Sequence, residues 1–261
     1  IYCPLAHWTW HPEGFLRVWG VLDFAGGTVV HMSAGFAALA GAYVLGKREE
    51  KQHQPANIPF IILGTGMLWF GWFGFNAGSA LAANGLAVQA FATTNMASAS
   101  AMITWVMFDA LVGRKISAMG ACIGAVVGLV AITPAAGFVN LGQSIFIGFV
   151  AAIISNMAVY YKNKTSLDDT LDVFPCHGLG GIVGMILTAV FAKDVGLMDG
   201  NTETIKYHLL ALVIVGVFTF GGSYVIFKIT GMITRLRVSP EDEQLGLDLS
   251  QHSETMKLST K

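Results

Sequence analysis

The sequence predicts an all-α protein, a polytopic bundle of membrane helices. Only 12% of the 261 residues are charged, about half of the share in an ordinary soluble domain. Hydrophobic residues make up 54%, and the mean hydropathy is +0.62. A soluble chain of this length would need more charge to cover its surface. The further observation is a series of apolar stretches, each about as long as a bilayer is thick.

Seven stretches match the roughly 20 mostly apolar residues that a membrane helix needs. They cover residues 22–45, 57–83, 91–112, 117–134, 143–161, 172–192 and 208–234. Several are rich in small residues, as in GACIGAVVGLVAI and GLGGIVGMILTAV, and small residues let helices approach closely in lipid. Membrane β-strands would instead alternate polar and apolar residues. We therefore expect one helical membrane domain over residues 1–234 and a cytoplasmic tail over 235–261.

Basic residues near the ends of these stretches predict the orientation in a cell membrane. One side carries Lys47, Arg48, Lys51, Arg114, Lys115, Lys162, Lys164, Arg235 and Arg237. The other side carries only Arg17, Lys193 and Lys206. The N-terminal end is thus expected outside and the tail in the cytoplasm. The net charge of −1 gives no reason to expect nucleic acid as a partner, and the three cysteines show neither metal-ligand nor redox spacing.

Ionisable residues inside membrane helices are rare and often functional. His31 lies about two turns into the first stretch, and His177 lies about a turn and a half into the sixth. For a single histidine a satisfied core residue is the simpler interpretation, but two at similar depth favour a shared polar path. Neutral imidazoles can line a pore, because one nitrogen donates and the other accepts. They can equally ligate a metal or haem.

Asp23 and Asp172 begin the first and sixth stretches. Helix capping or packing is the favoured interpretation for both, because a carboxylate satisfies the free N–H groups at a helix start. In GWFGFNAGSA, residues 71–80, Phe73 and Phe75 point about 200° apart on a helix and cannot share one lumen. Phe75 and Ser79 do share a face. Beside an outer tryptophan they would offer π faces and one hydroxyl to a cation.

Long motifs in this chain resemble the ammonium transporter (Amt/Mep) family, which is related to the Rh proteins. The resemblance is carried by DFAGGTVVHMSAGFAALAGAYVLGKR, GWFGFNAGSA, GLVAITPAAGFV, DVFPCHGLGGIVG and LRVSPEDEQLGLDLSQH, in the family's order. It implies an eleven-helix fold, outer N-terminus, inner C-terminus and homotrimers with one pore per subunit. The seven stretches would match the fifth to eleventh helices, so the chain, which begins at Ile1, is expected to be a C-terminal fragment lacking the first four.

The same resemblance implies site residues. Trp10 would be the tryptophan of an outer recruitment site, preferred to Trp8 because of its spacing from Asp23. Ser79 would supply that site's hydroxyl, and Phe75 would be one of two phenylalanines that close the pore mouth. Asp23 would support this vestibule from behind. His31 and His177 would be the twin histidines of the pore.

The implied function is ammonium transport rather than catalysis, without a cofactor or metal. Ammonium is recruited at the aromatic site and loses its proton, and ammonia passes the histidines with or without that proton. The alternatives are a haem- or metal-binding subunit that uses His31 and His177, an Rh-like gas channel, and an ammonium sensor. For the tail, the resemblance implies contact with a neighbouring subunit and with a PII-type signalling protein. Asp248 is expected there to cap a helix or to pair with a neighbour's basic residue, whereas a solvated tail is the simpler alternative.

Overall fold

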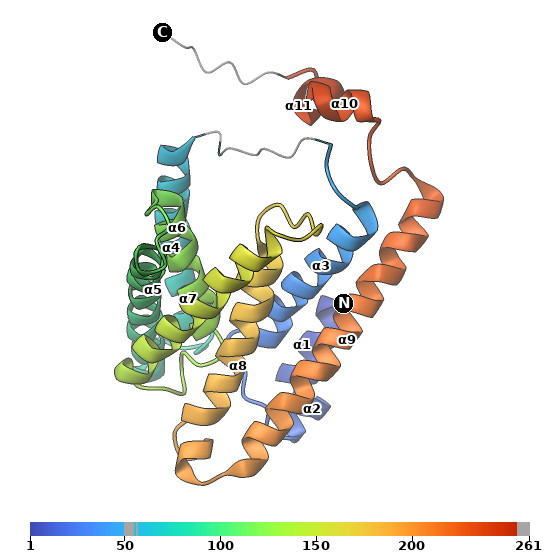
Figure 1. Cartoon of the computed structure of the whole chain (residues 1–261). Coiled ribbons are helices and arrows are strands. Elements are labelled where there is room, and N and C mark those ends of the chain that lie inside the picture. The colour runs from blue at the N-terminus through green and yellow to red at the C-terminus, as the bar shows by residue number, and fades with distance from the viewer. Residues whose placement is uncertain (50–54, 56, 255–261) are drawn as a thin grey trace.

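Helices form all the regular structure in the part of the chain that is described. The computed structural model describes residues 1–49, 55 and 57–254 (Figure 1). The elements are α1 Tyr2–Trp10, α2 Phe15–Val18, η1 Gly27–Met32, α3 Ser33–Leu45, α4 Ile58–Gly78, α5 Gly85–Leu111, α6 Ala118–Ile132, α7 Leu141–Lys162, η2 Phe174–Gly178, α8 Leu179–Phe191, η3 Leu197–Asp199, α9 Thr202–Ile233, α10 Pro240–Leu245 and α11 Leu247–His252.

Short polar side chains start most of the long helices. Each accepts a hydrogen bond from a backbone N–H of the first turn: Asn57, Asn84, Ser117, Asn140 and Asn201. At α7 the Gln143 side chain also accepts from the Asn140 N–H, at 2.9 Å, which completes a capping box. These caps satisfy amide groups that have no partner within the helix.

Five helical segments within the described residues are long and apolar enough to cross a bilayer. They are Gly27–Leu45, Ile58–Gly78, Leu141–Lys162, Phe174–Phe191 and Thr202–Ile233, and they coincide with five of the seven expected stretches. The other two correspond to α5, which has 27 residues and several polar side chains, and to α6, which has 15. The predicted all-helical, apolar architecture is confirmed, and the number of membrane crossings stays a prediction.

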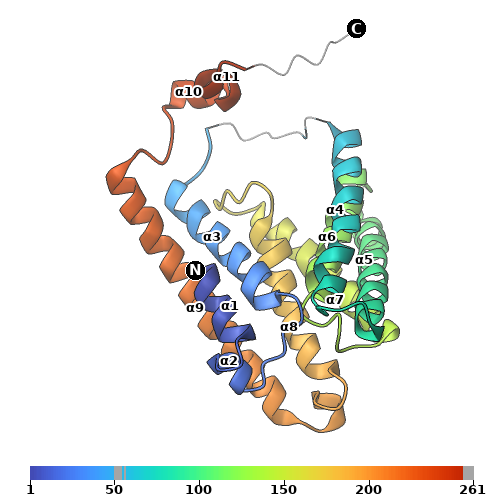
Figure 2. The ribbon, with the colours of Figure 1, turned by 180° about the vertical axis from the view of Figure 1, so that it is seen from behind.

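Two groups of helices meet at α8. In one group α5 lies along α6 and α7, with α4 beside them; in the other, α3 lies along α9, with α1 and α2 next to them (Figures 1 and 2). One hydrophobic core joins α5, α6, α7 and α8, and a second joins α1, α2, η1 and α9. The element η2–α8 touches α3, η1, α6 and α7, so it lies where the two groups adjoin.

The small residues allow the close packing that the sequence predicts. A side chain on Gly124 or Gly128 of α6, or on Gly148 of α7, would collide with the backbone of α5. The same holds for Gly184 of α8 against Ala131 of α6. The helices therefore touch at backbone distance, as expected for a bundle whose contacts are glycines and alanines.

Candidate functional site

Each of the two pore-candidate histidines lies in a π-helical turn that opens a longer helix. His31 belongs to η1, which continues into α3, and His177 belongs to η2, which continues into α8. Turns of this kind are rare and often occur at functional sites. The two helices cross where Gly35 faces Gly178, because a side chain on Gly35 would collide with the Gly178 backbone. This close crossing brings the two imidazoles together.

The histidines form a hydrogen-bonded pair. Their Nδ1 atoms are 3.2 Å apart, and the ring centroids are 5.3 Å apart. His31 is 2% exposed, whereas His177 is half-buried. At this distance one Nδ1 carries a proton and the other accepts it. The two histidines that the sequence places on a shared polar path are therefore in direct contact, and their role in a pore stays a prediction.

Thr133 decides which nitrogen carries the proton. The Thr133 hydroxyl has one hydrogen and donates it to the Leu129 carbonyl oxygen at 2.8 Å. Its oxygen also lies 3.1 Å from Nε2 of His31, so this contact requires an Nε2–H that donates to Thr133. In neutral His31 the Nδ1 is then the acceptor, and Nδ1 of His177 is the donor. The remaining nitrogen, Nε2 of His177, is an acceptor with no hydrogen bond among the described residues.

Trp72 and Phe75 surround His31 on the α4 side. The Trp72 indole N–H also donates to Thr133, at 3.0 Å, and its ring stacks on His31 with centroids 5.3 Å apart and planes 14° apart. Phe75 meets Trp72 and His31 edge-on, at 5.5 and 6.1 Å, and is 37% exposed. Phe73 points elsewhere and stacks on Phe91 at 4.0 Å. The predicted separation of the two phenylalanines is confirmed.

Asp23 caps the turn that carries His31. Its carboxylate accepts from the N–H groups of Gly26, Gly27 and Thr28, at 2.8, 2.6 and 2.8 Å, and from the Thr28 hydroxyl at 2.5 Å. The capping interpretation is therefore confirmed. The Asp23 backbone carbonyl accepts from Trp10 Nε1 at 2.9 Å, so the same residue also holds this tryptophan.

Ser79 and Trp8 form no hydrogen bond with Trp10 or Asp23 among the described residues. The Ser79 hydroxyl donates to the Phe75 carbonyl at 2.9 Å, and no hydrogen bond joins it to Trp10 in residues 1–49, 55 and 57–254. Trp8 packs against Phe15 and Phe218, with ring centroids 5.1 and 4.7 Å away. Of the two candidate tryptophans, Trp10 is thus the one that contacts Asp23.

Asp172 has a structural role but does not cap its helix, because Asp169 takes that place. Asp169 is 4% exposed, and its carboxylate accepts from the N–H groups of Val173 and Phe174 at 3.0 and 2.7 Å. Asp172 has a left-handed backbone, with φ of 54°, and pairs with Lys162 at 2.7 Å.

Sequence reasoning missed Trp72, Thr133 and Asp169. A signal was available for Asp169, which lies eight residues before His177, the same spacing as between Asp23 and His31. Trp72 lies three residues before Phe75, on a shared helix face. Thr133 offers no such pattern, because a single threonine beside Pro134 is ordinary in a membrane helix.

A second set of polar contacts lies at the opposite end of α3, beside the tail. Arg48 binds Asp168 at 2.6 and 2.8 Å. Glu243 of α10 accepts from Arg237, at 2.8 to 3.1 Å, and from the Glu49 backbone N–H at 2.7 Å. These bonds, first that from Glu49 and then those from Arg237, lower the pKa of Glu243.

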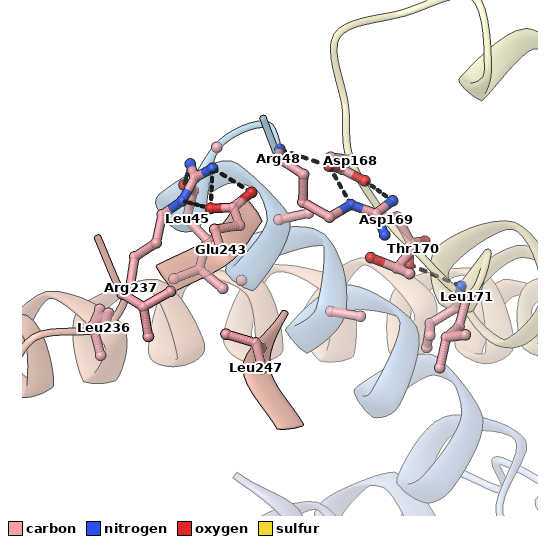
Figure 3. A pocket seen from close by; sticks show the side chains of 16 residues that line it. Leu45, Arg48, Asp168, Asp169, Thr170, Leu171, Leu236, Arg237, Glu243 and Leu247 are labelled. Atoms are coloured by element: carbon pink, nitrogen blue, oxygen red, sulfur yellow. Dashed lines mark hydrogen bonds and ion pairs between the residues drawn. The ribbon is translucent and has the colours of Figure 1, made fainter. Parts of the chain in front are cut away.

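A cavity of about 610 Å³ lies between these ion pairs (Figure 3). Its lining includes Leu45, Leu236 and Leu247, and Figure 3 shows Arg237 joined to Glu243 and Arg48 joined to Asp168 at its rim. It therefore belongs to the contact between the tail and α3, and its lining includes neither His31 nor His177. Asp248 lies in the first turn of α11 and is exposed, with no side-chain hydrogen bond in the described part of the chain.

Comparison with known proteins shows which family this chain matches. The family model described as Ammonium Transporter Family matches residues 1–257. An ammonium transporter of Aquifex aeolicus is 46% identical over 97% of this chain and 61% of its own length. One of Bacillus subtilis is 43% identical over 97% of this chain and 65% of its own length. The crystal structure of Saccharomyces cerevisiae Mep2 matches all of this chain and 63% of its own, with a TM-score of 0.89 and 36% identity. The chain thus spans less than two thirds of these relatives.

Proposed function

The chain belongs to the ammonium transporter family, and on that premise we propose that it carries ammonium across a membrane as part of a transporter. The observation that carries the proposal is the hydrogen-bonded pair His31–His177, which two helix turns hold at their crossing. The members of this family are multi-pass helical membrane proteins. We propose further that the seven apolar stretches are the fifth to eleventh helices of an eleven-helix, trimeric transporter, with its N-terminal side outside and its tail inside.

The recruitment residues offer acceptors and π faces rather than charges. The Trp10 indole N–H is bound to Asp23, so its ring face is what remains for a cation. The Ser79 hydroxyl hydrogen is bound to the Phe75 carbonyl, so its oxygen remains as an acceptor. A cation that carries N–H groups can donate hydrogen bonds to the oxygen and to the ring face, whereas K⁺ has no hydrogen to donate to either. This is a basis for selecting ammonium.

Asp23 supports this site without touching the cation. Its carboxylate already accepts four hydrogen bonds, which is about the full capacity of the group, and it is 6% exposed. Asp23 acts through its backbone carbonyl, which holds Trp10, and through its carboxylate, which holds the turn with His31. We assign to Asp169 the same role for the turn with His177.

Inside the pore the histidines accept ammonia and take part in moving its proton. A bare ion in a narrow apolar path is strongly disfavoured, and burial lowers the pKa of an amine by up to about 3–5 units. Ammonium can therefore release a proton, whereas K⁺ has none to release. Nε2 of His177 is the acceptor that the hydrogen-bond network leaves open, and the shared Nδ1–H lets charge pass between the two rings.

The geometry of the histidine pair does not favour the haem or metal alternative, because the two Nδ1 atoms bond each other. Within the described residues no three His, Cys, Asp or Glu side chains gather as a metal site would need. Nε2 of His31 is also occupied by Thr133. An Rh-like gas channel differs from a transporter of net charge in the current that accompanies uptake, and a sensor differs in having no sustained flux.

Expression of the full reading frame in cells that lack ammonium uptake tests the proposal. We expect growth on limiting ammonium and uptake of labelled methylammonium, and we expect both to be lost when His31 and His177 are replaced by alanine. Membrane current recorded during uptake separates charge transport from gas conduction. Correctly inserted protein that supports neither growth nor uptake would contradict the proposed function.

A further inference from the structure

A third histidine, His208 in α9, is fully buried, with 0% of its surface exposed. It does not contact the pair His31–His177, and the proposed transport steps do not use it. A buried polar side chain in a membrane helix needs hydrogen-bond partners. Its partners lie in two other parts of the fold, so His208 joins three segments of the chain.

Both ring nitrogens of His208 are occupied. Nδ1 lies 2.9 Å from the Met185 carbonyl oxygen in α8, and a carbonyl only accepts, so Nδ1 carries the hydrogen. Nε2 accepts the backbone N–H of Leu22 at 2.9 Å. Only the neutral ring with its hydrogen on Nδ1 satisfies both contacts, because a hydrogen on Nε2 would face the Leu22 N–H.

Leu22 lies in a stretch without regular structure that joins α2 to η1. Its amide therefore has no helix or strand partner, and the imidazole takes that place. The next residue is Asp23, whose carbonyl holds Trp10 and whose carboxylate caps the turn with His31. His208 thus anchors the peptide directly before the residue on which the outer site and the π-helical turn both depend.

We propose that His208 is a positioning residue for the recruitment site, acting through the Leu22 amide on Asp23 and hence on Trp10. The inference rests on the proposed function for its transport consequence, but the anchoring itself does not depend on it. The competing view is that His208 only ties α9 to α8 through Met185. In the proposal the important contact is that of Nε2 with Leu22, whereas in the competing view it is that of Nδ1 with Met185.

Two amide variants test the contacts of these two nitrogens separately. In H208Q the longer side chain places its carbonyl oxygen near the position of Nε2, so it can accept from Leu22. In H208N the shorter amide lies near the position of Nδ1, so it can donate to Met185. The variant H208L removes both contacts while it stays apolar and similar in volume. All three are made in the full-length transporter and compared for yield and oligomeric state.

The first measurement is amide hydrogen exchange of the segment 21–26, and the second is the apparent KM for ammonium uptake. We expect H208Q to keep slow exchange and a KM within about twofold of the wild type. H208N and H208L should show faster exchange and a KM raised by about fivefold or more, as expected when a partly buried amide loses its partner. Vmax should change less than KM.

Equal exchange and equal KM in H208Q and H208L would overturn the inference, as would a loss confined to H208Q. If H208N does not fold, the comparison of H208Q with H208L decides in the same way. If the wild-type protein does not transport, the proposed function fails, whereas the exchange rates still establish whether His208 holds the segment before Asp23.

Discussion

His31 and His177 are 146 positions apart in the chain, yet their Nδ1 atoms lie 3.2 Å from each other. The approach depends on two glycines, because Gly35 follows His31 by one helical turn and packs on the backbone of Gly178, the neighbour of His177. No larger residue allows two helix backbones to come so close. The pair is thus positioned by the crossing of its helices rather than by the imidazoles themselves.

Replacing Gly35 with alanine should push the two helices apart. We expect a loss of about 1–3 kcal/mol of stability from overpacking, seen as a lower unfolding temperature in detergent, and a clear loss of uptake because the imidazoles separate. Gly221→Ala in α9 is the matched control, since a side chain there meets nothing within 4 Å in the described residues. Equal uptake and unfolding temperature in the two variants would show that the crossing is not tight.

Thr133→Val should impair transport through the histidine pair while both histidines are retained. Valine has a similar shape but no oxygen, so the N–H groups of His31 and Trp72 both lose their acceptor. An unsatisfied buried donor is disfavoured by about 1–3 kcal/mol, and we expect the uptake rate to fall about tenfold.

Thr133→Ser is the control for this network, because it keeps the hydroxyl and should retain most of the uptake. Initial rates of methylammonium uptake at equal surface expression measure the difference. A valine variant as active as the serine variant would remove Thr133 from the network that sets the proton positions.

Much of this site could be predicted from the sequence, because ionisable residues are conspicuous in apolar stretches. His31, His177 and the cap by Asp23 were recognisable from residue type and depth alone. Asp169 was missed in favour of Asp172, which is closer to the apolar stretch, because the left-handed turn at Asp172 cannot be seen in residue type. The π-helical turns and the role of Thr133 depend on tertiary contacts, and neither leaves a periodic pattern.

The number of membrane crossings is likewise only partly predictable from the sequence. The stretch that became α5 is apolar on average, but Thr93, Thr94 and Ser98 are fully buried and bond to neighbouring carbonyl groups or to Asn76. Their polarity is hidden inside the bundle, so hydropathy underestimates how well such a helix suits a membrane. Composition therefore predicts the class of fold better than the exact number of crossings.

His31→Asp and His177→Asp should alter selectivity in the full-length transporter. A carboxylate in the lumen stabilises a bare cation and removes the advantage of neutral ammonia. We expect K⁺ leakage in at least one of the two variants, measured as growth of cells that lack K⁺ uptake on limiting K⁺. His177→Asn adds no charge and should not leak. Background K⁺ flux in both aspartate variants, with ammonium uptake intact, would contradict selection by deprotonation.

Glu243→Gln should loosen the tail from α3. The charge of Glu243 holds Arg237 and the Glu49 amide together, and α10 has no buried residue to hold it otherwise. Hydrogen exchange over residues 240–252 should become faster at pH 7. Glu241→Gln is the control, because Glu241 bonds only near the start of its own helix. Unchanged exchange in Glu243→Gln would mean that the tail is held by other contacts.

The pH dependence of this docking follows from the lowered pKa of Glu243. A carboxyl group with a lowered pKa contributes its full stabilisation above the ordinary value of about 4.3 and loses it only as the pH falls through the lower docked value. The protection of the tail amides, meaning their exchange rate relative to the intrinsic rate of an unstructured chain at the same pH, should therefore stay constant in the wild type between about pH 6 and 8 and fall only in strong acid. A transition near neutral pH would require a different titrating group.

Deletion of the chain from Glu241 onward should reduce transport without loss of the proposed trimer, because the deletion leaves α9 and every other apolar helix whole. In this single chain Leu245, Leu247 and Leu249 are 40 to 58% exposed, which is more apolar surface than a solvated tail presents, and the exposed Asp248 adds a charge that a neighbour's basic residue can meet.

If the tail contacts the next subunit, trimers that mix intact and deleted subunits should transport less than their intact subunits alone would supply. The measurement is uptake by purified mixed trimers of known composition in vesicles, with intact trimers diluted into empty vesicles as the control. Uptake strictly proportional to the number of intact subunits would mean that each tail acts only on its own pore.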